Sequence, residues 1–349
     1  MNLIAKDSAW PIPERMTSTA TSTRDSGIDA MRGIAILMVI GIHSLQQPLG
    51  TWAIAIDASL RPCVPIFLFA SGYLTARTGR VPLWKRLKAT LIPYSIAFGA
   101  AYIYMALHNP AMDHRPVTTI ARYVLAYAFI YYYVFVYVGC TLGLWLVFSV
   151  SRIGAPPSDT RLVVLLLLTI ALGLIAGSYL DPLLSRLGFP DHVVEEVRMR
   201  DIPFWFSFMA LGTLTGLART SLSDMRVLLS GATPAAFMIY AAVRLFGLGD
   251  AADYDSSAFF GYAALLVILL LVLDIRSPYL AVLGTGSYFI YLWHIFIVMT
   301  LRDHADLQRF GSVASFSITY AVTALGSITA LLAIQTAAPP TLRRWLGVS

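Results

Sequence analysis

The stretch IDAMRGIAILMVIGIHSL, residues 28–45, has the length and composition of a helix that crosses a membrane. It nevertheless carries Arg32 near its start and His43 far inside it. Ionisable groups are costly in hydrocarbon and normally face a bundle interior or a water-filled cavity. The eleven-residue spacing amounts to three turns plus about 20°, so both side chains project from one face, about 16 Å apart along the helix axis. The stretch therefore predicts a helical membrane bundle whose first helix has an inward functional face.

The composition of the whole chain agrees with this interpretation. Its 349 residues are 58% hydrophobic and 13% charged, whereas soluble domains are about 45–50% apolar and about 25% charged. Alternating strand patterns are absent, so we expect an all-α integral membrane protein, a bundle of about ten transmembrane helices. The predicted spans are 28–48, 58–76, 89–107, 130–150, 162–180, 203–219, 227–247, 257–273, 282–301 and 313–335.

The distribution of Lys and Arg predicts the orientation. With the N-terminus inside, most basic residues fall on cytoplasmic segments and most acidic residues on the outer ones, which leaves Arg244 inside the seventh span. An even number of spans puts both termini in the cytoplasm. The net charge of +6 is then explained by cytoplasmic loops, and nucleic-acid binding is not expected. We expect a poorly ordered tail at 1–27, one transmembrane domain at 28–340 and a cytoplasmic tail at 341–349.

The fourth span belongs to an apolar stretch, about 119–150, that is too long to cross the membrane straight. We expect its first third to lie in the outer interface, where amphipathic tyrosines collect. Tyr123, Tyr127 and the run Tyr131 to Tyr133 suit that position.

Three further segments combine polar residues with predicted spans. FLFASGYL (67–74) carries Ser71 and Gly72, small residues that allow close helix packing. KRLKATLIPY (85–94) begins with Lys85, Arg86 and Lys88, which suit either ordinary cytoplasmic charge or a phosphate clamp. GTGSYFIYLWHIFIV (284–298) places His294 mid-span, near Tyr291. Taken singly, Arg32 also fits a membrane anchor, and each histidine fits a buried helix-to-helix hydrogen bond.

The four segments, in this order and spacing, resemble the acyltransferase-3 family of membrane acyltransferases over about residues 27–340. The family begins its first span with Asp-x-x-Arg-Gly and places a histidine eleven residues after the arginine, which Asp29, Arg32, Gly33 and His43 match. Its Phe-x-x-Ser-Gly-aromatic-Leu segment, its basic loop and its late Ser-Tyr-x-x-Tyr-Leu-x-His segment are matched by the other three stretches.

The resemblance implies transfer of an acyl group, most often acetyl, from cytoplasmic acyl-CoA to a hydroxyl of a cell-surface glycan or lipid-linked sugar, in the bacterial cytoplasmic (inner) membrane. Acyl-CoA would be the donor substrate, with no tightly bound cofactor and no metal. Other polysaccharide-assembly proteins would be possible partners, besides the bilayer.

The predicted roles follow from residue chemistry within that reaction. His43 is the expected general base for the acceptor hydroxyl. Arg32, Lys85, Arg86 and Lys88 would bind the anionic part of CoA, and Arg32 is also a candidate catalytic contact to the thioester. His294 could orient His43, contact the acceptor or relay a proton. Supporting residues would be Asp29, which can orient Arg32, together with Ser71, Gly72 and Tyr291.

Two other functions fit parts of the sequence. A proton-coupled transporter or flippase of a sugar-containing substrate would use Arg32, His43 and His294 as a relay, but the chain lacks the inverted repeat and paired broken helices of such folds. A non-catalytic receptor or scaffold is disfavoured because no sizeable soluble domain is visible.

Overall fold

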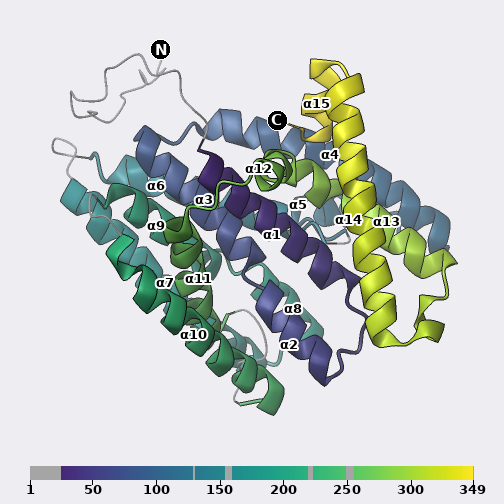
Figure 1. Ribbon diagram of the computed structural model, residues 1–349, viewed down its shortest axis with the longest axis horizontal. Coiled ribbons are helices and arrows are strands. Elements are labelled where there is room, and N and C mark those ends of the chain that lie inside the picture. The colour runs from purple at the N-terminus through teal and green to yellow at the C-terminus, as the bar shows by residue number, and fades with distance from the viewer. Residues whose placement is uncertain (1–24, 129, 154–158, 219–222, 249–254, 349) are drawn as a thin grey trace.

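The computed structural model describes residues 25–128, 130–153, 159–218, 223–248 and 255–348 (Figure 1). Over these ranges the chain is helical and contains no strand, as the all-α expectation requires. Most of the predicted tail at 1–27 lies outside the described residues. The α-helices are α1 (Ser26–Ser44), α2 (Thr51–Leu60), α3 (Cys63–Thr78), α4 (Leu83–His108), α5 (Pro116–Val124), α6 (Tyr132–Val150), α7 (Asp159–Arg186), α8 (Asp191–Met199), α9 (Ile202–Leu217), α10 (Arg226–Phe246), α11 (Ser257–Leu273), α12 (Pro278–Thr285), α13 (Ser287–His304), α14 (Ser312–Ala337) and α15 (Pro340–Leu346).

Seven helical segments in the described ranges are long and apolar enough to cross a membrane, with α2 and α3 counted as one. The number rises to eight if α12 and α13, which meet at an angle of 77°, form one broken span. Each of the ten predicted spans coincides with a helix or helix pair, but α9 and α11 have only 16 and 17 residues. Ten crossings and cytoplasmic termini therefore stay predictions.

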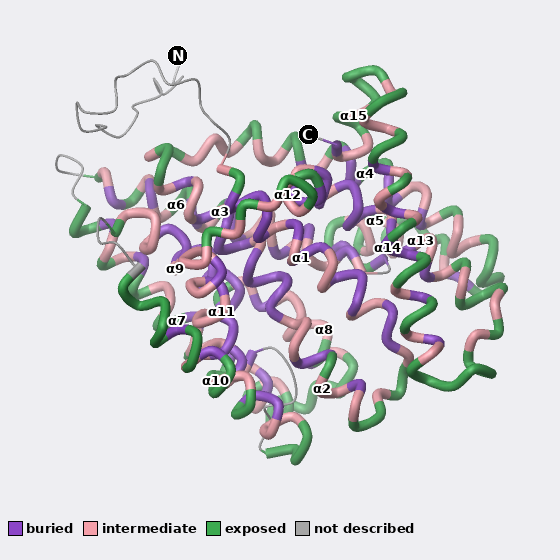
Figure 2. The backbone as a smooth tube through the Cα atoms, viewed as in Figure 1, coloured by how far each residue is buried: buried purple, intermediate pink, exposed green. Residues whose placement is uncertain are grey.

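The first helix lies inside the bundle, whereas α7, which contains the most apolar stretch among the seven candidate spans, lies at its edge (Figure 2). In the most apolar window of each helix, 67% of α1 is buried but only 22% of α7. Lipid tails are as apolar as leucine side chains, so an outer helix can expose them at no cost. Polar residues are found instead on the central helices, where neighbouring helices can provide hydrogen-bond partners that lipid lacks.

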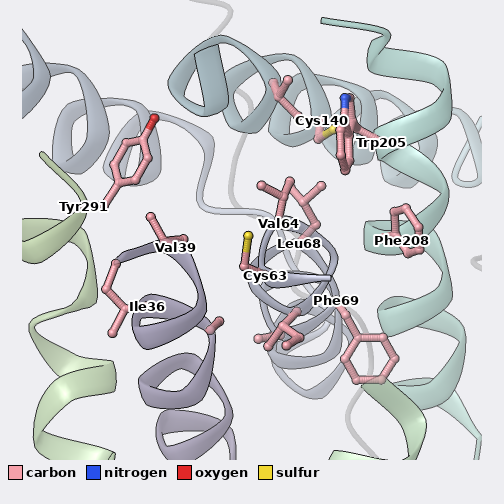
Figure 3. Packing of buried hydrophobic residues seen from close by; sticks show 14 of the residues in the cluster. Ile36, Val39, Cys63, Val64, Leu68, Phe69, Cys140, Trp205, Phe208 and Tyr291 are labelled. Carbon is pink, nitrogen blue, oxygen red and sulfur yellow. The ribbon is translucent and has the colours of Figure 1, made fainter. Parts of the chain in front are cut away.

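The core is built on α3, which packs closely against α9 and lies beside α1 (Figure 3). A Cβ atom on Gly72 would lie 2.0 Å from the carbonyl oxygen of Met209, and one on Gly212 would lie 2.1 Å from that of Phe69. The two backbones therefore touch, as small residues allow in membrane bundles. Cys63 and Cys140 are buried in the same core as free thiols.

A second close crossing joins α1 to α12. A Cβ atom on Gly33 would lie 2.1 Å from the carbonyl oxygen of Leu280, and one on Gly284 would lie 1.8 Å from that of Asp29. The chain bends at Gly286, directly after this contact, and α13 begins at Ser287. The crossing therefore fixes where α13 starts relative to the first turns of α1.

Ion pairs stabilise the opposite end of the bundle, around α2 and α8 (Figure 1). Arg244, which the predicted topology left inside a span, donates to Asp57 of α2, and the Nε of Arg61 donates to the same Asp57 oxygen at 2.9 Å. Arg244 and Asp57 are both nearly buried. The pairing explains how a cation is tolerated at this position.

Among the described residues, the carboxylates of Asp181, Asp201 and Asp255 and the guanidinium of Arg198 meet where α7, α8 and the residues before α11 converge. Arg198 donates to Asp181, and its Nε lies 3.6 Å from Asp255. Burial, reinforced by the charge of Asp181, raises the pKa of Asp255 to about 7 and that of Asp201 to about 6. The single guanidinium of Arg198 therefore does not neutralise all three carboxylates. In the folded state, Asp201 and Asp255 stay protonated at pH values above the usual pKa of aspartate.

The glycine crossing of α1 and α12 can be tested by adding one methyl group. We expect Gly284→Ala to cost about 1–3 kcal/mol, because backbone atoms cannot move aside as a flexible side chain can. Gly231→Ala, in an exposed part of α10 with nothing within 4 Å, is the control and should be neutral or slightly stabilising. Thermal unfolding in detergent measures both. Equal Tm values for the two variants would contradict the crossing.

The carboxylate group predicts a dependence of stability on pH. The raised pKa values mean that the folded protein binds more protons than the unfolded chain between about pH 4 and pH 7. Its free energy of unfolding should therefore fall as pH rises through that window. We expect Asp255→Asn to reduce the difference in Tm between pH 5 and pH 8, and Asp274→Asn, at an exposed pair with Arg276, to leave it unchanged. If Asp255→Asn leaves the difference in Tm between pH 5 and pH 8 undiminished, Asp255 is not a source of this pH dependence.

Candidate active site

A basic cavity of about 910 Å³ is lined by residues from the first half of α1, the start of α4 and α15, among others. None of the described residues that line it is Asp or Glu. Five cations from three helices, α1, α4 and α15, do line it: Arg32, Lys85, Arg86, Lys88 and Arg344. The four residues predicted to bind the donor are thus brought together although α1 and α4 are far apart in sequence. A cavity with this charge suits a ligand that carries several negative charges.

Arg32 is held by side chains from two helices. Its Nη1 donates to Asp29 Oδ1 at 3.4 Å, one turn earlier on α1, as the predicted orienting role of Asp29 requires. Its Nη2 donates to Ser287 Oγ at 3.1 Å, and that hydroxyl donates in turn to the carbonyl oxygen of Gly284 at 2.8 Å. Guanidinium has five N–H donors, so donors are left for a ligand in the cavity.

The remaining predicted cations sit at the beginning of α4. No acidic residue lies in the first turn of this helix, and Lys85 and Lys88 are exposed beside the cavity. Arg86 is partly buried and donates to Thr75 Oγ1 at 2.5 Å. Cations at a helix N-terminus oppose the helix dipole, whereas an anion bound there is stabilised by both the dipole and the cations. The local charge therefore fits an anion at this position.

A second cavity, of about 820 Å³, contains His43 and lies toward α2 and α8. We call it the His43 cavity. Asp57, Arg61, Arg302 and Asp303 are among the charged residues in its wall, and aromatic rings such as Tyr104 and Trp205 line it too. Arg302 Nη2 donates to the backbone oxygens of His43 and Leu45, at 2.9 and 3.0 Å. Mixed polar and aromatic walls of this kind suit a polar ligand with many hydroxyl groups.

His43 and His294 form a pair, with ring centroids 5.4 Å apart. His294 is fully buried, and its Nδ1 lies 2.9 Å from the carbonyl oxygen of Ile290. A carbonyl oxygen only accepts, so Nδ1 carries the proton and Nε2 has a lone pair. That Nε2 is buried and has no partner among the described residues. The geometry therefore offers His43 a hydrogen-bond acceptor.

Tyr133 and Tyr291 lie between the two cavities, since both residues line both of them. Their rings are 5.4 Å apart and nearly perpendicular, and the Tyr291 hydroxyl donates to the carbonyl oxygen of Ile130 at 2.7 Å. Arg32 thus faces one cavity and His43 the other, on opposite sides of a pair of tyrosines. The eleven-residue spacing predicts only a shared face and different depths, and the two separate cavities are a finding of the structure.

The two small residues predicted on α3 have different positions. Ser71 lies in the wall of the basic cavity. Gly72 lies at the contact with α9 described above and is not among the described residues that line the basic cavity or the His43 cavity. Gly72 therefore positions α3, and Ser71 is the one available to a ligand.

The outer-interface position of Tyr131 to Tyr133 stays a prediction, but two of the three tyrosines lie inside the bundle and not on its outer surface. Tyr131 is fully buried and donates to the carbonyl oxygen of Leu292 at 2.8 Å, and Tyr133 lies between the cavities. A phenol can enter a bundle when its hydroxyl finds a carbonyl partner there. Ser287 belongs to the matched Ser-Tyr-x-x-Tyr-Leu-x-His segment but was not among the predicted site residues, and Arg302 was not predicted at all. The one available signal was Arg302 itself, a cation on the outer side that the positive-inside rule does not explain.

Comparison with protein families identifies the chain. Residues 25–333 match the family model described as an acyltransferase domain, Acyl_transf_3. The chain belongs to the acyltransferase-3 family. The predicted resemblance is confirmed, and the chain is a multi-pass membrane acyltransferase. Comparisons with curated proteins and with solved structures found no match.

Proposed function

We propose that this acyltransferase moves an acyl group, in the simplest case acetyl, from acyl-CoA in the basic cavity to a hydroxyl of a glycan or lipid-linked sugar in the His43 cavity. The observation that carries the proposal is the pair of cavities that meet at Tyr133 and Tyr291. One has five cations and no acid in its described wall, and the other holds the histidine pair.

The donor would bind with its phosphates among Arg32, Lys85, Arg86 and Lys88. The basic cavity is within the usual size range of small-molecule sites, about 300–1,000 Å³. Its apolar and aromatic inner wall, which includes Phe67 and Tyr133, would contact the pantetheine arm. That arm must cover most of the roughly 16 Å between the levels of Arg32 and His43. The thioester would then lie near the tyrosine pair.

The acceptor would react on the far side of the tyrosine pair. His43 takes the proton from the acceptor hydroxyl as its oxygen attacks the thioester carbonyl carbon. The new carbon–oxygen bond forms, the carbon–sulfur bond breaks, and the thiolate of CoA receives a proton from the imidazolium. His294 Nε2 would accept an N–H from His43 and hold the other ring nitrogen unprotonated toward the hydroxyl. Of the three roles predicted for His294, the geometry favours orienting His43.

The predicted orientation completes the proposal. Acyl-CoA is made in the cytoplasm, so the basic cavity would open there and the His43 cavity would open on the outer face of a bacterial cytoplasmic membrane. Glycan-assembly proteins would deliver the acceptor. The transporter alternative remains distinct, because transport moves a sugar without forming a new ester.

The role of His43 is tested by acetyl transfer from labelled acetyl-CoA to surface glycan, with purified protein in lipid vesicles. We expect His43→Ala to lower kcat by about 10²–10⁴-fold, the usual contribution of a general base. His192→Ala, an exposed histidine of α8, is the matched control and should be unchanged. Near-normal turnover by a folded His43→Ala protein would contradict the assignment. Movement of unmodified sugar with no ester formed would instead support the transporter.

The same assay separates orientation from packing at His294. An amide oxygen can accept the hydrogen bond that Nε2 is proposed to accept, so His294→Gln should retain more kcat than His294→Ala at equal Tm. Equal losses in both variants would mean that His294 acts in another way.

A further inference from the structure

Residues 338–348 follow α14 and lie outside the family match, which ends at residue 333. They form α15 and a short turn that folds back onto the bundle. Gly347 has a left-handed backbone with φ of 88°, and the Val348 N–H donates to the carbonyl oxygen of Arg343 at 2.8 Å. This helix end satisfies late carbonyl groups of α15 and directs the chain inward.

The turn is docked on the bundle. Val348 is only 5% exposed and belongs to the hydrophobic core. The indole N–H of Trp293, on α13, donates to the carbonyl oxygen of Leu346 at 3.3 Å. A Cβ atom on Gly347 would lie 3.1 Å from the Tyr288 ring and 3.4 Å from Pro93. The segment therefore packs against both α4 and α13, next to the basic cavity.

Docking places four residues of this segment in the cavity wall: Arg344, Trp345, Gly347 and Val348. Arg344 is exposed there, and no hydrogen bond or ion pair engages its guanidinium in the part of the chain that the structure describes. The neighbouring Arg343 does not line the cavity, and its Nε donates to the carbonyl oxygen of Ala338 at 2.7 Å. Two adjacent arginines thus have different positions: Arg343 is bonded to the end of α14, and Arg344 faces the cavity.

We propose that the segment 338–348 is part of the donor site and that Arg344 binds a phosphate of the acyl donor. The inference rests on the proposed function, since it takes the basic cavity as the acyl-CoA site. The cavity already holds four cations from α1 and α4, and Arg344 adds a fifth from a different side. Guanidinium matches phosphate through paired N–H donors, which explains an arginine at an exposed position without a protein partner. The segment thereby completes a site that the family-matched region leaves open on one side.

The experiment is calorimetric titration of CoA into the full-length protein in detergent micelles. We expect Arg344→Gln to raise the Kd for CoA about 10-fold, the loss of one charge-assisted contact. Arg343→Gln removes the same charge from the same helix and should change Kd less than about 2-fold. Arg344→Lys keeps the charge, so its Kd for CoA should lie between that of Arg344→Gln and that of the unaltered protein. The Tm of each variant is measured alongside, and because Arg344 is exposed, no loss of folding is expected.

The outcomes separate this inference from the function on which it rests. Suppose that the unaltered protein binds CoA, that replacing Lys85, Arg86 and Lys88 by Gln weakens CoA binding, and that Arg344→Gln leaves it unchanged. The segment is then not part of the donor site, although the donor assignment stands. If the unaltered protein does not bind CoA, the donor assignment itself fails. Equal weakening by Arg343→Gln and Arg344→Gln would also overturn the inference, because it would show a general charge effect.

Discussion

The candidate site depends on the close crossing of α1 and α12 at Gly33 and Gly284. This contact lets the Asp29 carbonyl approach α12 more closely than any side chain would allow. The bend at Gly286 then starts α13 beside Arg32, so Ser287 reaches its guanidinium. Further along, α13 brings His294 against His43 of α1. Two points of chemistry at different depths are thus set by a single helix contact.

Pairing with nearby polar side chains explains why charged groups can lie inside an apolar bundle. Arg32 is offset by Asp29 and by a hydroxyl, and Arg244 by Asp57. His294 has only its Nδ1 satisfied. A buried acceptor without a donor costs free energy, so the place of His294 beside His43 is best explained by use. Arg344 is exposed to solvent, and it faces a cavity that holds four other cations.

Much of the fold and of the site follows from the sequence, because hydropathy and the 3.6-residue period are local properties. Every predicted span is helical, and the shared face of Arg32 and His43 leads to two adjoining cavities. Depth within the bundle is not a local property. The apolar α7 lies outside, and α1, which carries charges, lies in the centre. Hydropathy alone does not separate the two positions, because an apolar side chain is equally stable against lipid and against other apolar side chains.

The remaining differences have similar causes. The predicted span 282–301 is broken at Gly286, because the contact of Gly284 with α1 is a tertiary one. Tyr131 and Tyr133 suit an interface by composition, and only the carbonyl of Leu292 and the ring of Tyr291 show why they lie inside. Arg344 reads as ordinary cytoplasmic charge, and its position in the cavity follows from the turn at Gly347.

The central claim is that the donor and the acceptor meet from opposite ends of the bundle, and the most direct test is the sidedness of transfer. Protein of one known orientation is placed in sealed vesicles, with acetyl-CoA and the glycan acceptor supplied on the same side or on opposite sides. The account predicts ester formation when acetyl-CoA is on the side of the basic cavity and the acceptor is on the other side. Transfer that requires both substrates on one side would contradict it.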